Sequence, residues 1–486
     1  MSPLLTPESL DGALSTGGWV RPGGGAAPVV EPATGRPLAR VGLAAPADVR
    51  RAAALAEAAQ PRWAKTAHQE RIAVLRRAAE LLLAHRQEFV EWLIRESGSI
   101  RAKAEHEIAS VHDELLVAAG LPGQPYGHLM PPVPGRRSTA IRVPVGVVGV
   151  ISPWNVPLVL SMRAVAPALA LGNAVVLKPD ARTAVCGGQL VARLFEDAGL
   201  PEGVLHVLPG GAAAGEALVD AREVSLIAFT GSTRVGRAIG ERAGRALKRT
   251  SLELGGNNAL IVLADADIEA AAGIGAFSSF FHQGQICMSA GRHIVVDSVA
   301  DAYVERLTAL ADELPVGDPW QEDVRIGPLI DAGQLKRVDG IVGESVAAGA
   351  RLRTGGTYRE LFYRPTVLDG VTPEMPAFRE EIFGPVAPVV RVRDEGEALA
   401  VANRTEYGLV ASVLTGSPER GEALAGQLRV GMAHINDPTI EDDAYVPFGG
   451  LGASGNGSRH GALNHWEEFT EWRWVTIRDR AAAPPF

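Results

Sequence analysis

Apolar positions recur with a helical period in the first third of the chain. Thr66 and Gln69 match a capping box, in which a hydroxyl side chain and a glutamine three residues later bond the free N–H groups at a helix start. The apolar residues that follow fall on one helical face; they are Ile72, Leu75, Ala79, Leu82, Leu83, Phe89, Val90 and Leu93. We expect an amphipathic helix that covers a large core.

From Val145 onward the pattern changes to short β-branched runs that alternate with helical stretches. The candidate strands are 147–151, 174–177, 204–207 and 225–229, and the candidate helices are 158–171 and 183–198. Such alternation predicts a mostly parallel sheet covered by helices. Loops and helix N-termini meet at the carboxyl ends of parallel strands, so we expect a nucleotide site there.

A second alternating region runs from about Leu254 to Leu451, with strand candidates at 259–262, 293–296 and 386–392. It predicts a second α/β unit. Two further strand candidates, 138–145 and 470–477, fit neither unit. Exposed strand edges are hazards unless they are paired, so we hypothesise that these two strands extend a sheet across a subunit boundary; an ordinary edge hairpin is the alternative. The tail 481–486 is expected to be frayed.

Charge and composition narrow the class of protein. The chain has 47 Lys and Arg against 56 Asp and Glu, a formal charge of −9 that is spread along the sequence, and no basic stripe predicts nucleic-acid binding. We find no window of the ~18 uninterrupted apolar residues that a membrane span needs. The segment 1–24 lacks a basic stretch followed by an apolar one, as a signal peptide would have. We expect a cytoplasmic protein.

The chain has two cysteines, Cys186 and Cys287, without the spacing of a metal site. Cys186 is expected to be a core residue. Cys287 alone would also be typical of a core, and Glu253 and Asn155 alone would be typical of turns or surfaces. Together, however, these three supply a nucleophile, a base and an oxyanion donor, which is the set that acyl chemistry at a carbonyl carbon needs.

With these motifs in view, the chain resembles the aldehyde dehydrogenase superfamily, from about Glu31 to the C-terminal strand. The motifs that carry the resemblance occur in the family's order; they are Pro153-Trp154-Asn155, Lys178-Pro179, Phe229-Thr230-Gly231-Ser232-Thr233, Glu253-Leu254-Gly255-Gly256, Gly284-Gln285-Ile286-Cys287, Glu380-Glu381-Ile382-Phe383-Gly384-Pro385 and Pro447-Phe448-Gly449-Gly450. The resemblance implies oxidation of an aldehyde to a carboxylic acid with NAD or NADP.

The resemblance also implies the fold and the domains. We expect an α/β fold with a Rossmann-like cofactor domain, an α/β catalytic domain and a small oligomerisation β-arm. The corresponding residues are 1–122 and 147–254 for NAD(P) binding, 255–454 for catalysis, and 123–146 and 455–486 for the arm and C-terminal strand. A homodimer or homotetramer is expected.

Roles for the catalytic residues follow from the resemblance. Cys287 would attack the aldehyde carbon, and the Asn155 amide and the Cys287 backbone N–H would bind the oxyanion. Loss of hydride would leave a thioester, and Glu253 would act as the general base for its hydrolysis.

The resemblance further implies a set of cofactor-binding residues. They are Ile151, Ser152, Pro153, Trp154, Lys178, Ala181, Gly231, Ser232, Val235, Leu254, Gly255, Glu381 and Phe383. Many NAD-preferring relatives carry a glutamate where this chain has Ala181, and that glutamate repels a 2′-phosphate. Because Ala181 lacks this charge and Arg182 adjoins it, NADP stays open as a cofactor, although we favour NAD.

Three segments, 178–188, 434–437 and 447–455, resemble the benzaldehyde dehydrogenase branch. This resemblance implies an aromatic or similarly bulky, uncharged aldehyde. The residues expected near the substrate are apolar; they are Val156, Leu160, Phe281, Ile286, Met288 and Phe448. Arg163 would recruit a substrate carboxylate if it faced the pocket, but we expect it to be solvated.

Aliphatic, terpenoid and semialdehyde substrates stay open as alternatives. Glu253 argues against a relative that passes the acyl group to coenzyme A. The intact catalytic set argues against a non-catalytic binding protein. The first βα turn lacks the G-x-G-x-x-G fingerprint of a plain alcohol dehydrogenase.

Overall fold

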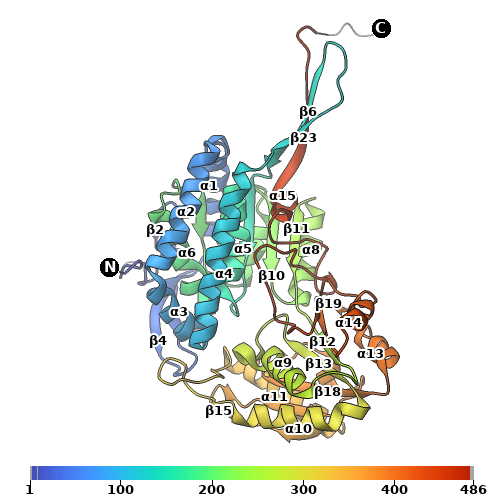
Figure 1. The fold of residues 1–486 in the computed structure, drawn as a ribbon. Coiled ribbons are helices and arrows are strands. Elements are labelled where there is room, and N and C mark those ends of the chain that lie inside the picture. Colours follow the sequence, from blue (N-terminus) through green and yellow to red (C-terminus); the bar gives the residue numbers. More distant parts are fainter. Residues whose placement is uncertain (1–2, 8, 482–486) are drawn as a thin grey trace.

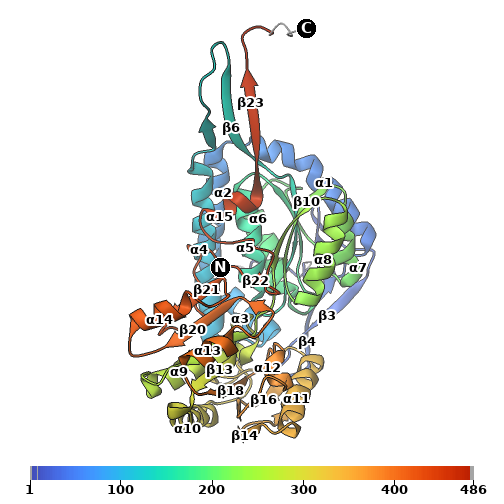
Figure 2. The same ribbon diagram turned by 90° about the vertical axis from the view of Figure 1, so that its right-hand side faces the viewer.

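The computed structural model describes residues 3–7 and 9–481. Two lobes, each built on a seven-stranded sheet, lie against each other, and a slender arm projects from the first lobe (Figures 1 and 2). The predicted α/β fold is confirmed. None of the described helices is long and apolar enough to cross a membrane. Of the tail expected to be frayed, 482–486 lie outside the described residues.

The first sheet has the strand order β11-β10-β7-β8-β9-β1-β2. Its five strands from β11 to β9 run parallel, and the short strands β1 and β2 close one edge in antiparallel fashion. The bounds are β11 (Arg249–Glu253), β10 (Val224–Thr230), β7 (Val147–Ile151), β8 (Ala174–Lys178), β9 (Leu205–Val207), β1 (Leu14–Ser15) and β2 (Trp19–Val20).

Helices cover both faces of this sheet (Figure 2), as the continuous apolar runs of its parallel strands require. One face packs against α2 (His68–Ala84), α3 (Arg86–Ser97), α4 (Arg101–Gly120), α5 (Pro157–Ala170) and α6 (Leu190–Asp197). The other face packs against α1 (Pro46–Lys65), α7 (Ala212–Asp220) and α8 (Thr233–Arg245).

The helix expected after Thr66 forms differently from the prediction. Thr66 ends α1, where its hydroxyl donates to the carbonyl of Arg62 (3.2 Å), and α2 starts after Ala67 with no side-chain cap. The predicted capping box is therefore wrong, because Thr66 already serves the preceding helix. The apolar stripe is also divided between α2 and α3 at His85, and Leu83 is 48% exposed.

The helix predicted over 183–198 begins irregularly. A 3-10 turn (Ala181–Thr183) and a π turn (Val185–Gln189) precede α6. The buried carboxylate of Glu96 accepts hydrogen bonds from the N–H groups of Val185 and Cys186 (2.9 and 2.7 Å), which fixes this wider turn. Cys186 is buried and free, as predicted.

The second sheet has the order β14-β17-β18-β13-β12-β20-β21, and only β14 runs antiparallel to its neighbour. The strand bounds are β14 (Arg351–Thr354), β17 (Thr366–Asp369), β18 (Val386–Val392), β13 (Ala290–Val296), β12 (Asn258–Val262), β20 (Val410–Leu414) and β21 (Met432–Ile435). Its helices are α9 (Ile268–Phe280), α10 (Asp297–Glu313), α11 (Ala332–Ala347), α12 (Pro376–Arg379), α13 (Glu395–Ala402) and α14 (Pro418–Ala425).

The two strand candidates outside both units pair with each other. β23 (Thr470–Ile477) runs antiparallel to β6 (Arg137–Pro144) along its whole length, and β5 (Gly127–Leu129) flanks β6. This three-stranded arm leaves the first lobe next to α15 (Asn464–Phe469) (Figure 1). Leu129 and Trp474 on the arm are 79% and 67% exposed.

Short strand pairs complete the description. They are β3 (Ala26–Val30) with β4 (Pro37–Gly42), β15 (Tyr358–Arg359) with β16 (Phe362–Tyr363), and β19 (Tyr407–Gly408) with β22 (Leu451–Gly452).

Candidate active site

Cys287 lies in a loop whose backbone is held in an unusual conformation. The loop follows α9, and its residues His282, Gln283 and Gly284 all have positive φ angles of 50°, 57° and 65°. A side chain at 284 would collide with the carbonyl oxygen of Gly384, 2.1 Å from the position of a Cβ atom, so only glycine fits there. Left-handed non-glycine residues are strained and persist only where their surroundings hold them.

Two glutamines hold this loop. The buried Gln283 amide donates to the carbonyls of Gly98 and Pro328 (3.1 and 2.9 Å). The Gln285 side-chain oxygen accepts from the N–H of Ile330 (3.0 Å). The loop is thus tied to segments from both lobes, and Cys287 is positioned between them.

The Cys287 side chain reaches two cavities, one on each side. Burial raises the pKa of its thiol to about 12, and the negative charges of Glu381, Glu253 and Asp442 act in the same direction. The group is therefore a neutral thiol near pH 7, and a base must take its proton before it can act as a nucleophile.

Asn155 stands between β7 and α5, and a buried ion pair of α4 holds this junction. The Glu107 carboxylate accepts from the N–H groups of Leu158 and Val159 at the start of α5 (2.8 and 3.3 Å) and pairs with Lys103. Lys103 in turn donates to the backbone carbonyl of Asn155 (3.1 Å). A carboxylate at a helix N-terminus satisfies N–H groups that have no partner within the helix.

Two N–H donors converge near the thiol. The Asn155 side-chain amide donates one hydrogen to the carbonyl of Gln285 (2.9 Å), which orients it toward the cysteine loop. The backbone N–H of Cys287 has no acceptor within the described part of the chain. Such a pair can bind an oxyanion that forms next to Cys287.

Glu253 ends β11 and is buried, with neither carboxylate oxygen hydrogen-bonded in the described structure. Burial raises the pKa of this carboxyl well above its usual value, while Arg163 and Arg459 act against that shift. Its charge acts on the Cys287 thiol. Its side chain lines neither of the two cavities that Cys287 reaches.

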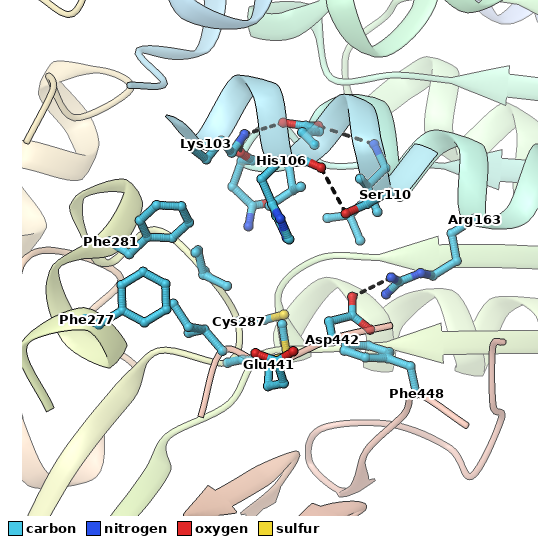
Figure 3. Close-up of a pocket in the computed structure, with 18 residues that line it drawn as sticks. Lys103, His106, Ser110, Arg163, Phe277, Phe281, Cys287, Glu441, Asp442 and Phe448 are labelled. Carbon is cyan, nitrogen blue, oxygen red and sulfur yellow. Dashed lines mark hydrogen bonds and ion pairs between the residues drawn. The ribbon is translucent and has the colours of Figure 1, made fainter. Parts of the chain in front are cut away.

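The first of these cavities, of about 240 Å³, lies between α4, α5, α9 and the loop after β21 (Figure 3). We call it the substrate-side cavity. All six residues expected near a substrate line it; they are Val156, Leu160, Phe281, Ile286, Met288 and Phe448. Phe277 adds a second aromatic ring, 4.9 Å from that of Phe281 between centroids. Aromatic and aliphatic side chains thus form most of the wall, with Cys287 at its base.

Arg163 also lines this cavity, but it is buried rather than solvated as expected. Its guanidinium bonds Glu114 (3.0 Å) and Asp442, and it lies over the Phe448 ring, 4.6 Å from the centroid. The prediction was wrong because the neighbours that pair with Arg163 come from distant parts of the chain.

The second cavity that Cys287 reaches has a volume of about 450 Å³, and a third of about 560 Å³ lies next to it at the carboxyl ends of the first sheet's strands; we call these two the cofactor-side cavities. They are lined by twelve of the thirteen expected cofactor residues; these are Ile151, Ser152, Pro153, Trp154, Lys178, Gly231, Ser232, Val235, Leu254, Gly255, Glu381 and Phe383. Ser232 stands directly before α8, so the free N–H groups of that helix face the cavity.

Glu381 packs against Gly255 and accepts from the N–H of Gly256 (3.0 Å). A Cβ atom at 255 would lie 2.2 Å from the Glu381 carboxylate, so this contact requires glycine. Burial raises the pKa of Glu381 to about 7. Phe383 has a φ of 56° and meets the Trp154 ring edge to face, with 5.5 Å between centroids.

Comparison with known proteins identifies the family. The profile of the Aldehyde dehydrogenase family matches residues 19–475. The chain belongs to this family. A vanillin dehydrogenase from Amycolatopsis sp. is 55% identical and covers 99% of this chain and 100% of its own length. A benzaldehyde dehydrogenase [NAD(+)] from Pseudomonas putida is 50% identical, with 98% of each chain covered. The crystal structure of an NAD-dependent benzaldehyde dehydrogenase from Corynebacterium glutamicum superimposes with a TM-score of 0.88 at 40% identity, covering 99% of each chain.

In this aldehyde dehydrogenase, Asn155 and Cys287 therefore lie together where two cavities meet. Glu253 lines neither cavity, but its charge acts on the Cys287 thiol. Ala181 is the expected cofactor residue that lines neither cofactor cavity. Its neighbours Asp180 and Arg182 line one instead, and Arg182 is paired with Asp180 and Asp331 (2.9 and 2.8 Å).

Sequence reasoning missed the face of α4 that completes the substrate-side cavity. Lys103, His106, Glu107 and Ser110 line it, and Figure 3 shows His106 pointing into it. Their spacing of three to four residues marks one helical face, but no motif connects that face with Cys287. Gln334 and Arg337 of α11, which line a cofactor-side cavity, were missed for the same reason.

Proposed function

We propose that this aldehyde dehydrogenase oxidises single-ring aromatic aldehydes to carboxylic acids, with NAD as the hydride acceptor. The observation that carries the proposal is the cavity of about 240 Å³ whose aromatic wall ends at Cys287. An apolar cavity of roughly 150 Å³ accepts benzene, so this one has room for a ring with one or two substituents. Similarity to proteins named for vanillin and benzaldehyde supports the same class.

In the first step, the Cys287 sulfur forms a bond to the aldehyde carbon, and the carbonyl oxygen takes up the electron pair. The thiol proton leaves through water toward Glu253, which takes it in its carboxylate form, and burial makes that carboxylate a stronger base than an exposed one. The Asn155 amide and the Cys287 N–H stabilise the oxyanion.

The residues present fit a dinucleotide along the two cofactor-side cavities. Among the described residues, the half-buried Lys178 amine bonds the carbonyls of Pro179 and Gly210 (3.2 and 2.9 Å), so it keeps a donor for a ribose hydroxyl. The Glu381 carboxylate has an oxygen left to accept from hydroxyl groups. The bound nicotinamide supplies the acceptor for the hydride that the former aldehyde carbon loses.

The acyl group then remains on Cys287 as a thioester. Glu253 first releases the thiol proton to bulk water and then takes a proton from the attacking water. The water oxygen bonds the acyl carbon, the carbon–sulfur bond breaks, and Glu253 returns its proton to the sulfur as the acid is released. Because the Glu253 carboxylate lies behind the cavity wall, this step needs a rotation of its side chain toward Cys287.

Similarity to a benzaldehyde dehydrogenase [NAD(+)] supports NAD as the cofactor. The cofactor-side cavity of about 560 Å³ is lined by Asp180 and Glu216 and by four cations. Arg182 and Arg242 are paired with Asp180 and Asp220, whereas Lys178 and Arg234 form no ion pair within the described residues. A 2′-phosphate would meet both signs of charge there, so NADP is the alternative cofactor.

We also propose the division of labour predicted for the domains: 1–122 and 147–254 bind the cofactor, 255–454 carry the catalytic loop, and 123–146 with 455–486 form an arm that joins subunits into a homodimer or homotetramer. The exposed Leu129 and Trp474 support the assembly role. A cytoplasmic location stays a prediction of the sequence alone.

The test is the rate of NAD reduction with benzaldehyde, in the wild type and in Cys287→Ala and Asn155→Ala. We expect turnover in the wild type, none in Cys287→Ala, and a loss of about 10²–10³-fold in Asn155→Ala. Turnover confined to short aliphatic aldehydes would contradict the aromatic assignment. Turnover that survives loss of Cys287 would contradict the mechanism.

A further inference from the structure

Both cations that line the substrate-side cavity are engaged by carboxylates of the protein. Lys103 pairs with Glu107, next to it on α4. Arg163 lies between Glu114, which is buried on α4, and Asp442, on the loop after β21. A carboxylate on a substrate would therefore find neither cation free of an acidic partner.

The acidic side chains of the wall outnumber these cations. Glu441 lines the same cavity and forms no ion pair with any residue in the described ranges. One oxygen of Asp442 is buried and has no hydrogen-bond partner among the residues that the structure describes. The charged wall consists of two cations and three carboxylates, namely Lys103, Arg163, Glu107, Glu441 and Asp442.

The acidic charge extends to the reacting end of the cavity. Asp442 acts on the Cys287 thiol, as do Glu253 and Glu381. Figure 3 shows Asp442 bonded to Arg163 and drawn between Arg163 and Cys287. An anionic group on a single-ring substrate thus enters a largely apolar cavity whose wall carries an excess of negative charge, part of it on the solvent-exposed Glu441, where like charges repel.

We propose that this cavity selects aldehydes by charge: Glu441 and Asp442 reject carboxylate- and phenolate-bearing aldehydes, and a ring hydroxyl is accepted only as the neutral phenol. This inference rests on the proposed function and adds the charge of the substrate to it. Arg163 is thereby not a carboxylate receptor, since Glu114 and Asp442 already neutralise it.

The experiment compares matched pairs that differ in charge and little in shape: 4-formylbenzamide against 4-formylbenzoate, and the two 3-formyl isomers. We expect kcat/KM for each carboxylate to be at least about 100-fold below that of its amide. Equal rates within a pair would overturn the inference and leave the proposed function standing. Failure to oxidise either member, or benzaldehyde, would overturn both.

Variants locate the effect. Asp442→Asn keeps the shape and an acceptor for Arg163, and should raise the carboxylate-to-amide ratio by about 10-fold or more, as should Glu441→Gln. Asp437→Asn is the matched control, because Asp437 is exposed on the same loop and lines no part of the cavity. Equal ratios in all three variants would overturn the assignment to these residues. Glu441→Gln keeps the test valid if Asp442→Asn does not fold.

A pH series on the wild type tests, without any variant, the prediction that a ring hydroxyl is accepted only as the neutral phenol. The ratio of kcat/KM for 4-hydroxybenzaldehyde to that for 4-methoxybenzaldehyde should fall as pH rises through the ionisation of the free phenol. The absorbance of the free 4-hydroxybenzaldehyde reports that ionisation. The methoxy compound cannot ionise, so it corrects for titration of the groups that face the ring, which are Lys103, His106, Glu107, Arg163, Glu441, Asp442 and Cys287. A constant ratio would contradict selection of the neutral phenol.

Discussion

Burial of ionisable groups is the dominant effect at the scale of single residues. Cys287, Glu253 and Glu381 all have raised pKa values because each loses hydration in the folded protein. A raised pKa makes each of these two carboxylates a stronger base, and Glu381, with a pKa of about 7, exchanges protons in the range where an enzyme works. The charges of Glu253 and Glu381 in turn raise the pKa of the Cys287 thiol, so the ionisation of the three groups is coupled.

Glu381 should make the protein less stable at alkaline pH. Its pKa rises from 4.5 to about 7 on folding, so folding favours the protonated form, and this contribution is complete below pH 4.5 and lost as pH rises through 7. Glu381→Gln, which stays neutral, should exceed the wild type in free energy of unfolding by about 3 kcal/mol above pH 8. Urea unfolding of the cofactor-free protein at pH 5 and 8.5 measures this. Glu380→Gln, at the exposed neighbouring position, is the control, and an advantage that does not grow with pH would contradict the argument.

At the scale of elements, the cysteine loop depends on anchors outside itself. His282 and Gln283 adopt left-handed conformations that cost about 1–3 kcal/mol each unless their surroundings hold them. The Gln283 amide supplies two of the bonds that do so. The loop is thus a strained segment whose geometry comes from the α3–α4 junction and from the chain near Pro328.

Gln283→Ala should lower both stability and turnover. It leaves the carbonyls of Gly98 and Pro328 without their donor, at a cost of about 1–3 kcal/mol each. It also frees the backbone that aims Cys287, so kcat should fall by about 10-fold or more. Thermal unfolding and steady-state rates measure the two effects, with exposed Gln321→Ala as control. Unchanged kcat in a folded variant would show that the loop needs no such anchor.

Elements were predictable where a motif occupies the end of one strand. Asn155 and Ser232 follow the largely apolar strands β7 and β10, and parallel strands gather their carboxyl ends at one edge. Glu253 ends β11, whose mostly polar sequence predicted no strand, so this residue was identified from its motif alone. The partners of Arg163 were not predictable, because Glu114 and Asp442 are 49 and 279 positions away. The capping box failed on a similar point, since Thr66 fits a helix start and a helix end equally well and only packing decides.

At the scale of the whole molecule, the arm presents apolar surface that none of the described residues covers. Leu129 and Trp474 are 79% and 67% exposed, on strands β5 and β23 at the two edges of the arm's sheet. Exposed strand edges pair readily with another chain. The shape in Figure 1 therefore suits an arm that lies against a second copy.

Polar substitutions on the arm should weaken assembly. The double variant Leu129→Ser, Trp474→Ser should sediment at a lower mass than the wild type at the same concentration, because it loses apolar surface from the proposed interface. Leu247→Ser, 93% exposed on the body of the first lobe, is the matched control. Identical masses for all three proteins would contradict the role of the arm. Sedimentation velocity distinguishes these results.

The position of Cys287 between cavities on opposite sides has a kinetic consequence. Of the residues in 3–7 and 9–481, only Asn155, Leu160 and Cys287 line both the substrate-side cavity and the cofactor-side cavity next to it. The acid and the reduced dinucleotide therefore leave in opposite directions, and neither obstructs the other. Product inhibition should follow this separation. Added acid should compete with aldehyde but not with NAD, and added NADH should compete with NAD but not with aldehyde.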